Sequence, residues 1–434
     1  MRMRSFENLG ETLWEATLPN GLRVAVIPKP AFASSYAVFA ANYGGAHRRF
    51  TVNGETSDTP AGVAHYLEHK MFDLPGGDNA MDLLAANGAD PNAFTSAGMT
   101  AYYFLCTGHF EENLRLLLHF VSTPYFTEET VRKERGIIAQ EIRMGEDEPG
   151  TRHYYELLKM LYARHPIRDQ VAGTVESIQD ITPETLYACH RAFYAPGNMA
   201  LVVEGPVDPE RVLAIAEAEL GSVQDPAPAV DFGEEESLLP LESFRLLEMP
   251  VSAPQFLIGA KFRPEAEGRA QLRQRLVSQL ALRALFGASS PFYTELYAKG
   301  LLNRDYSYEA DFAAGTGTVL IGGESPDPQA VFAALREAVA AVKEKGLDAE
   351  RFERARRASY GSRLRGFEDF ESVCLSTVTG LFRGYCALEA PEVLAGITKA
   401  ECEAFLCQTL APERLALAVM RAGKEDDDDA AAAV

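Results

Sequence analysis

The alternation of apolar and polar positions predicts a mixture of strands and helices. Residues 22–27 and 34–42 are rich in β-branched and aromatic side chains, which favours strands. Helical periodicity predicts helices at about 60–73, 78–87, 110–122 and 127–146. Segments 92–96 and 100–106, joined by a turn, are typical of a hairpin. A later helix begins near Thr182 and ends before Pro196, and a strand follows at 200–204.

An internal repeat indicates that the chain consists of two similar halves. Residues 181–203 align without a gap with residues 397–419, and both copies contain a helix, an Ala-Pro turn and a strand. The identical pairs are Ile181/Ile397, Thr182/Thr398, Ala188/Ala404, Ala195/Ala411, Pro196/Pro412, Ala200/Ala416, Leu201/Leu417 and Val203/Val419. A proline-rich, acidic stretch at 222–243 predicts a linker. We therefore expect an α+β fold with two homologous domains, 1–221 and 244–420, followed by an acidic disordered tail at 421–434.

Composition and charge narrow the classes of partner. The net charge of −21 argues against nucleic acid and anionic membranes, because their phosphates would be repelled. No apolar run has the length of a membrane span, and the first residues lack the apolar core of a signal peptide. Six cysteines in 434 residues are too sparse for a disulfide framework. These features together predict a cytoplasmic protein.

The clearest chemical motif lies in the segment 61–72. It contains His65, Glu68 and His69 in an H-x-x-E-H spacing. Residues four apart share one face of a helix, so both imidazoles can bind one metal ion, and Glu68 can reach a water at that ion. Thr59 and Pro60 predict that this helix starts with a threonine cap and a first-turn proline.

A third metal ligand is expected from another helix. Glu134 and Glu141 are seven residues apart, about two helical turns, and therefore share a face. One of them can bind the metal while the other hydrogen-bonds a ligand, and the spacing does not decide which. All eight histidines lie at or before His190, so the second half is predicted to be a metal-free, degenerate copy.

Two histidines and a glutamate, with a second glutamate as base, form the ligand set for metal-assisted hydrolysis of an amide. Glu68 would take a proton from the attacking water and pass it to the leaving amine. Zinc suits this set best, with one ion per chain, although related sites accept manganese or cobalt. Peptide bonds are the natural substrate, and esters and other amides remain open.

The segments His65–His69 with Met71-Phe72, 92–96 and 134–141 together resemble the pitrilysin/insulinase/mitochondrial-processing-peptidase family of zinc metallopeptidases. The resemblance covers most of residues 15–420. More narrowly, 68–72, 173–178 and the overall length are similar to YmfH-type bacterial members. It implies the processing-peptidase (LuxS-like metallohydrolase) fold, in which each domain has a mixed, mostly antiparallel sheet packed with helices.

The resemblance also assigns roles to individual residues. It implies that Glu141 binds the zinc ion and that Glu134 holds a ligand in place without binding zinc itself. It implies that segment 92–96 is an edge strand to which substrate adds as a further strand, with Asn92, Ala93 and Phe94 as contacts. The alternative for this segment is an ordinary hairpin with Phe94 in the core.

The second half departs from the family pattern. The family carries an arginine and a tyrosine seven apart after a Pro-Phe segment, and these reach toward substrate at the zinc. Here Pro291-Phe292 is followed by Tyr297 and Arg304, in inverted order. The departure predicts that a sister chain supplies the pair in a heterodimer, with a homodimer as the alternative. The resemblance implies that the paired subunits enclose a chamber. Packing for Tyr297 and a surface charge for Arg304 is the competing interpretation.

Three functional hypotheses follow. The first is a zinc endopeptidase that hydrolyses short or unfolded peptides as the catalytic subunit of a dimer. The second is a non-catalytic structural subunit, against which the intact ligand set argues. The third is a dedicated maturation factor for one partner peptide or protein. Metal content and activity separate the second from the others.

Overall fold

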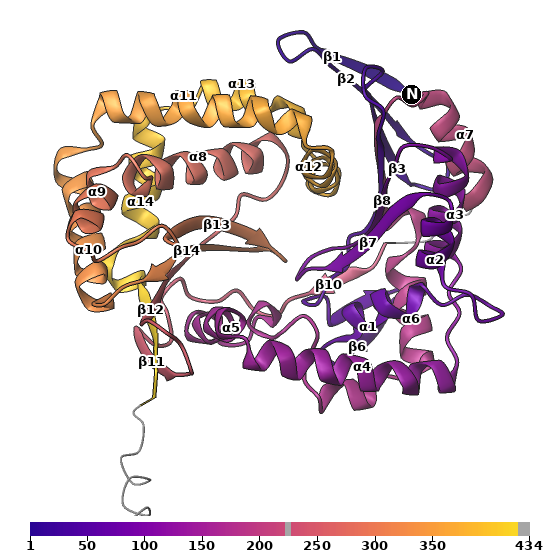
Figure 1. The fold of residues 1–434 in the computed structure, drawn as a ribbon, viewed down its shortest axis with the longest axis horizontal. Helices are drawn as coiled ribbons and strands as arrows, with labels where there is room; N and C mark the ends of the chain where they lie inside the picture. The colour runs from indigo at the N-terminus through magenta and orange to yellow at the C-terminus, as the bar shows by residue number, and fades with distance from the viewer. Residues whose placement is uncertain (222–226, 424–434) are drawn as a thin grey trace, which may run out of the picture.

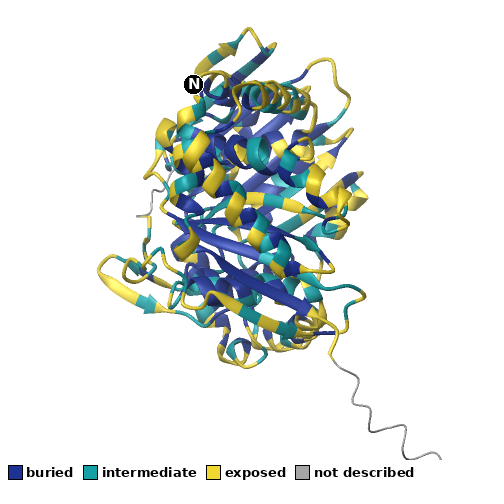
Figure 2. Ribbon diagram, turned by 90° about the vertical axis from the view of Figure 1, so that its left-hand side faces the viewer, coloured by how far each residue is buried: buried dark blue, intermediate teal, exposed yellow. Residues whose placement is uncertain are grey.

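The computed structural model describes residues 1–221 and 227–423, which form two sheet-and-helix halves (Figure 1). Most of the acidic tail predicted at 421–434 therefore lies outside the described residues. The central strands of the sheets are buried, whereas several edge strands and the outer faces of the helices are exposed (Figure 2). The predicted α+β class is confirmed.

The first half is built on a seven-stranded sheet with the order β1-β2-β3-β9-β4-β8-β7. Only β3 and β9 pair in parallel, and the other neighbours are antiparallel. The strands are β1 (Arg2–Phe6), β2 (Glu11–Thr17), β3 (Arg23–Pro28), β4 (Ser35–Ala41), β7 (Ala89–Thr95), β8 (Thr100–Cys106) and β9 (Met199–Gly205). β7 is an edge strand, as the resemblance implied for segment 92–96.

Helices cover one face of this sheet and bury its main core. Alternate strand residues such as Val24 and Phe39 point into that core, because successive side chains of a strand face opposite sides. The helices of the half are α1 (Val63–Met71), α2 (Ala80–Ala86), α3 (Phe110–Ser122), α4 (Glu128–Asp147), α5 (Pro149–Leu161), α6 (Pro183–Phe193) and α7 (Pro209–Leu220). A separate small sheet joins β5 (Arg49–Val52), β6 (Glu55–Asp58) and β10 (Ala229–Asp231) in the order β10-β5-β6.

The second half repeats this arrangement in a five-stranded sheet with the order β11-β15-β12-β14-β13. This sheet also has one parallel pair, β11 and β15, and its other neighbouring strands are antiparallel. The strands are β11 (Phe244–Glu248), β12 (Gln255–Phe262), β13 (Ser307–Ala313), β14 (Thr316–Glu324) and β15 (Ala416–Arg421). The helices are α8 (Gly268–Phe286), α9 (Pro291–Ala298), α10 (Pro328–Lys345), α11 (Ala349–Arg365), α12 (Phe370–Arg383), α13 (Ala390–Ala395) and α14 (Lys399–Thr409).

The repeat found in the sequence is a repeat of structure. α6 and β9 in the first half correspond to α14 and β15 in the second, and the helix bounds keep the residue offset of the sequence alignment. Thr182 and Thr398 cap these two helices in the same way, each accepting a hydrogen bond from the backbone N–H three residues on. The prediction of two homologous α+β units is confirmed.

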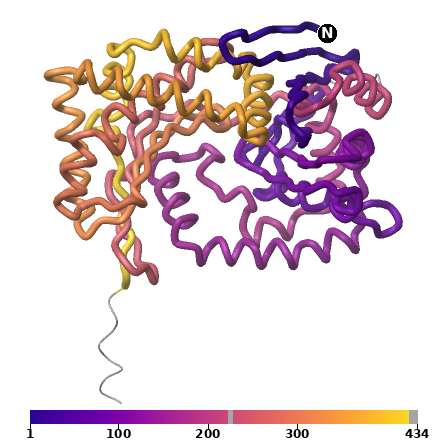
Figure 3. The backbone as a smooth tube through the Cα atoms, turned by 45° about the horizontal axis from the view of Figure 1, so that its top comes forward, coloured from indigo at the N-terminus to yellow at the C-terminus, as the bar shows by residue number. Residues whose placement is uncertain are grey.

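Each half lends one helix to the sheet of the other half. α5 packs on the second sheet, where Gly259 leaves room: a Cβ there would lie 2.8 Å from a methyl carbon of Leu157. His153 Nε2 lies 3.0 Å from the Ala418 carbonyl oxygen. In return, α12 packs on the face of the first sheet that α1–α4 leave open. The N-terminal hairpin also reaches the second half, where Arg4 pairs with Glu389 (Figure 3).

The stretch 222–243, predicted as a linker, makes specific contacts in its described part, 227–243. It contains β10, which pairs with β5. The Glu236 carboxylate accepts hydrogen bonds of 2.7 Å from the backbone N–H groups of Ala163, Arg164 and His165. Nowhere in the described ranges does a helix combine the length and apolar character needed to cross a bilayer.

Candidate metal centre

The helix that carries His65, Glu68 and His69 is α1, and it begins at Val63 rather than near Pro60. The predicted start was wrong because Thr59 is used elsewhere: its hydroxyl donates to the Arg48 carbonyl at 3.0 Å. Gly62 precedes the helix with φ of 98°, and a Cβ there would lie 2.5 Å from the Ala172 carbonyl oxygen. A glycine is therefore required where α1 turns in beneath the 172–178 loop.

α1 and α4 bring the three predicted ligands together. Ligand atoms of His65, His69 and Glu141 all lie within 4.8 Å of one another. The two imidazole centres are 4.6 Å apart on successive turns of α1. Nε2 of His65 lies 3.3 Å from Glu141 Oε1, and Nε2 of His69 lies 3.5 Å from Glu141 Oε2. The spacing of residues along two helices has thus become one cluster of donor atoms.

Glu134 contacts the Nδ1 atom of His69 and does not belong to the ligand cluster. Its Oε1 lies 2.9 Å from His69 Nδ1, so the ring donates through Nδ1 and keeps Nε2 free for a metal. Burial lowers the pKa of His69, but the hydrogen bond and charge of Glu134 outweigh it, and the pKa lies above its ordinary value. Burial raises the pKa of Glu134, and its bond to His69 outweighs this, so its pKa lies below the ordinary range.

Glu68 is buried on α1 and does not belong to the ligand cluster. Its Oε2 accepts a hydrogen bond from Thr95 Oγ1 at 2.5 Å. Thr95 is the last residue of the edge strand β7, and Thr100, its partner across the hairpin, has its hydroxyl 3.2 Å away. Thr95 is a residue that sequence reasoning missed, and its only signal there is its place in the quoted segment 92–96.

Asn92, Ala93 and Phe94 lie on β7, which pairs with β8 on one side only. All three are at least partly exposed, and Asn92 Oδ1 accepts from the Ala93 N–H at 2.8 Å. Phe94 packs partly against the core beneath α12. The strand therefore offers an unpaired edge that ends at the hydrogen bond to Glu68.

The structure does not join Tyr297 and Arg304 to this cluster by any contact recorded within residues 1–221 and 227–423. Tyr297 lies on α9, is 47% exposed and stacks on Tyr293 with ring centres 5.6 Å apart. Arg304 is exposed in the loop before β13. Their role toward substrate stays a prediction.

The donor set fits zinc. Two imidazole nitrogens and one carboxylate oxygen converge, and a set of three protein ligands is the pattern of catalytic rather than structural zinc sites. A hydrogen bond from His65 lowers the pKa of Glu141, which favours the ionised form that a metal needs. Within the described ranges, this is the one cluster of three metal-ligating side chains that was found.

Comparisons with known proteins identify the relatives of this chain. Residues 53–175 match the family described as "Insulinase (Peptidase family M16)", and residues 180–359 match "Peptidase M16 inactive domain". The chain is 37% identical over 94% of its length, and 96% of the relative's, to "Uncharacterized zinc protease YmfH" of Bacillus subtilis.

Solved structures give the same result. The chain resembles a putative M16-like peptidase from Alicyclobacillus acidocaldarius with a TM-score of 0.91 and 35% identity, over 95% of this chain and 99% of that one. A protease from Helicobacter pylori has a TM-score of 0.82 at 16% identity, over 94% and 99% of the two chains, which speaks for the fold alone.

Proposed function

Because this chain belongs to the M16 (insulinase) peptidase family, we propose that it is a zinc-dependent endopeptidase that hydrolyses short or unfolded peptides. The observation that carries the proposal is the convergence of His65, His69 and Glu141 within 4.8 Å, with Glu68 on the same helix. The relative named above is itself called a zinc protease.

Zinc held by these ligands would lower the pKa of a bound water to about 7 and polarise the carbonyl group of the substrate. Glu68 accepts the proton of the attacking water and then delivers it to the leaving amine. Thr95 holds the Glu68 carboxylate by a hydrogen bond. Glu134 fixes the orientation and tautomer of His69.

The free edge of β7 positions the substrate. An extended peptide that pairs with β7 would lie along Asn92, Ala93 and Phe94 and would bring one of its carbonyl groups toward the metal cluster. Main-chain hydrogen bonds supply most of the affinity in this mode, so cleavage is expected to tolerate many sequences.

The chain works, in our proposal, as the catalytic subunit of a heterodimer that encloses a chamber. The inverted positions of Tyr297 and Arg304, and their lack of recorded contact with the metal cluster, motivate this. A sister chain of the same fold would supply the missing arginine and tyrosine. A dedicated maturation factor for one partner remains the second candidate, and it would use the same site.

Cleavage of a mixed fluorogenic peptide library tests the proposal. The purified chain is assayed with zinc and with a chelator, alone and together with a sister chain of the same genome. Chelator-sensitive cleavage only in the mixture supports the heterodimer. A fully active homodimer on gel filtration contradicts the heterodimer but leaves the peptidase in place, and no cleavage in any arm by the zinc-loaded chain contradicts the peptidase.

A further inference from the structure

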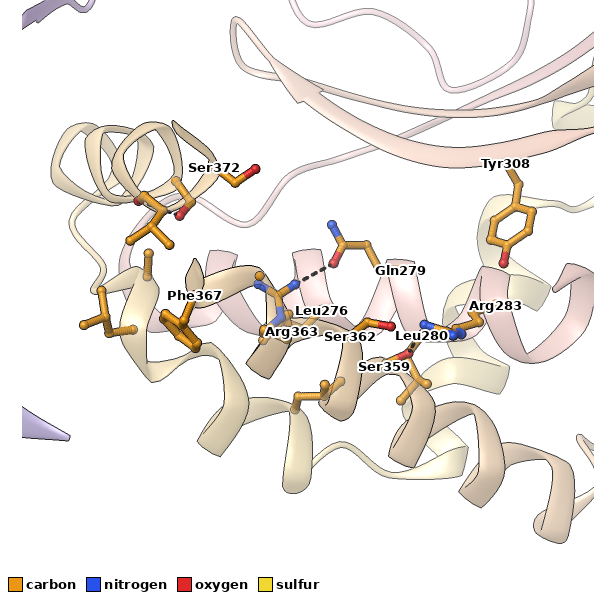
Figure 4. Close-up of a pocket in the computed structure, with 16 residues that line it drawn as sticks. Leu276, Gln279, Leu280, Arg283, Tyr308, Ser359, Ser362, Arg363, Phe367 and Ser372 are labelled. Atoms are coloured by element: carbon orange, nitrogen blue, oxygen red, sulfur yellow. Dashed lines mark hydrogen bonds between the residues drawn. The ribbon is translucent and has the colours of Figure 1, made fainter. Parts of the chain in front are cut away.

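A cavity of about 510 Å3 lies in the second half, between α8, α11 and α12 (Figure 4). Two arginines, Arg283 of α8 and Arg363 of α11, point into it with Tyr308 of β13 and several serine hydroxyls. Its apolar wall consists of Leu276, Leu280, Phe367, Val373, Leu388 and Leu394.

The cavity lies beside the pair of helices in the second half that corresponds in chain order to the pair carrying the metal cluster in the first half. α8 is the first helix between β12 and β13, as α1 is the first helix between β4 and β7. α11 is the second helix after β14, as α4 is the second helix after β8. In the first half, α1 faces α4 through His65 and Glu141. In the second half, α8 faces α11 through Gln279 and Arg363, 3.1 Å apart, and one turn further on through Arg283 and Ser359, 3.4 Å apart. Where the first half has metal-ligating side chains between its two helices, the second half has two arginines.

Both guanidinium groups keep hydrogen-bonding capacity for a ligand. Their recorded partners here are a neutral amide and a hydroxyl, and in the described part of the chain neither forms an ion pair with a carboxylate. A guanidinium has five N–H donors, so each retains several. Burial lowers the pKa of Arg363, the cost of holding a cation away from water without an anion.

The residues that line the cavity carry positive charge, whereas the net charge of the whole chain is negative. The chain has 62 acidic residues among 434, yet none of the 16 residues that line the cavity is acidic. Among the acids next to lining residues in the chain, Asp369 caps α12, where Ser372 donates to it at 2.7 Å, and Glu389 pairs with Arg4. Glu368 and Glu371 line a separate pocket with residues of β4, β7 and β8. A local field of this kind selects an anion, and the arginine fork matches the planar pair of oxygens of a carboxylate and also fits a phosphate.

We propose that this cavity binds a carboxylate-bearing segment of the peptide substrate, with Arg283 and Arg363 on the carboxylate and the leucine-rich wall on a neighbouring apolar side chain. The peptide nature of the ligand rests on the proposed function above. The carboxylate is that of an acidic side chain or of the peptide's C-terminus, and both would be read by the same two guanidinium groups. The site thereby favours acidic peptides, which the charge of the rest of the chain would repel.

Calorimetric binding tests the proposal in the zinc-loaded Glu68→Gln protein, whose peptides are not consumed. The probe is a short peptide that ends in Glu-Leu with a free carboxyl group. Two variant peptides, one ending in Gln-Leu and one ending in Glu-Leu-amide, show whether the gain in affinity comes from the acidic side chain or from the C-terminal carboxylate. A neutral peptide that carries both changes is the reference. The expected result is binding at least roughly 10-fold tighter than the reference, weakened by salt.

Further substitutions in the Glu68→Gln protein distinguish binding at this specific site from general electrostatic attraction. Arg283→Gln with Arg363→Gln should abolish the preference, and the corresponding double lysine variant should retain part of it, because lysine keeps the charge but not the fork. Arg336→Gln, an exposed charge change on α10 of the same half, is the matched control and should leave the preference unchanged.

Equal binding of the acidic and neutral probes, or an unchanged preference in the double glutamine variant of a protein with native circular dichroism, would overturn the proposal. Failure of the proposed function gives a different result. In that case the parent protein with its sister chain would cleave no peptide, whereas the calorimetric preference would persist.

Discussion

Thr95 donates its hydroxyl hydrogen to Glu68, with Oγ1 and Oε2 2.5 Å apart. This bond ties the last residue of the edge strand β7 to the buried carboxylate on α1. In the proposed mechanism, a peptide that pairs with the strand would be held in fixed register with the group that handles the proton. That mechanism would couple substrate placement to proton transfer through the Thr95 hydroxyl.

Replacing Thr95 by valine removes this hydroxyl while keeping the shape of the side chain. We expect kcat to fall by roughly 10-fold with little change in KM, because the carboxylate is less well oriented but the strand edge remains. Steady-state kinetics on a fluorogenic peptide measure both constants. Thr95→Ser should restore most of kcat, and a valine variant with unchanged kcat would show that the bond has no positioning role.

Replacing Glu68 by glutamine removes the base without changing the volume of the side chain. Hydrolysis should fall by about 10²–10⁴-fold, since proton transfer to and from the water is lost. The measurement is the chelator-sensitive rate of peptide cleavage by the parent and by the Glu68→Gln protein, at equal protein and zinc concentrations and under the conditions in which the parent is active. Activity within a few-fold of the parent would exclude Glu68 as the base.

Glu134 and Glu141 should differ in their effect on metal affinity. Glu134→Gln weakens the support of His69 and is expected to cost about 10–100-fold in zinc affinity. Glu141→Gln removes a ligand and should cost more. Competition with a chromophoric chelator measures both, and Glu146→Gln, an exposed change on the same helix, is the control. Equal losses from the Glu134 and Glu141 variants would contradict the distinction between them.

Glu204 on β9 makes stability depend on pH. It is fully buried beneath α12, and burial raises its pKa to about 8, against the attraction of Lys29, which lies 3.4 Å away and is also paired with Glu11. Cys374 of α12 is its other neighbour, at 3.8 Å. Because the folded state keeps the proton above the ordinary glutamate pKa, stability from this group is full below about pH 4.5 and is lost as pH rises through about 8.

Glu204→Gln keeps the neutral form at every pH. The free energy of unfolding of the parent should therefore fall relative to the variant between pH 5 and 8, by on the order of 2–4 kcal/mol. Chemical denaturation at several pH values measures it. Parallel pH profiles for the two proteins would show that the carboxyl group titrates normally.

The sequence was most informative where local rules decide the structure. The helix at 110–122 coincides with α3, whose polar first turn and apolar face are plain in the sequence. The histidine and glutamate spacings on α1 and α4 predicted the cluster, because the helix period fixes which side chains share a face. The ligand role of Glu141 needed the family resemblance, since the period places Glu134 on the same face.

Sequence reasoning failed where distant contacts decide. Thr59 has a capping residue type but bonds Arg48 instead, and only the approach of Ala172 to Gly62 sets the helix start. The exchange of α5 and α12 between the sheets depends on packing surfaces of the whole fold. The pairing of Gln279 with Arg363 joins residues far apart in the chain and carries no local signal.

Zinc content tests the central claim most directly, namely that the first half holds a catalytic zinc whose ligands are separate from its base. The parent, Glu68→Gln and Glu141→Gln proteins are purified in parallel and analysed for metal by mass spectrometry. The account predicts about one zinc per chain in the parent and in Glu68→Gln, and little in Glu141→Gln. A parent protein that binds no zinc, or a Glu68→Gln protein that loses it as fully as Glu141→Gln, would contradict the account.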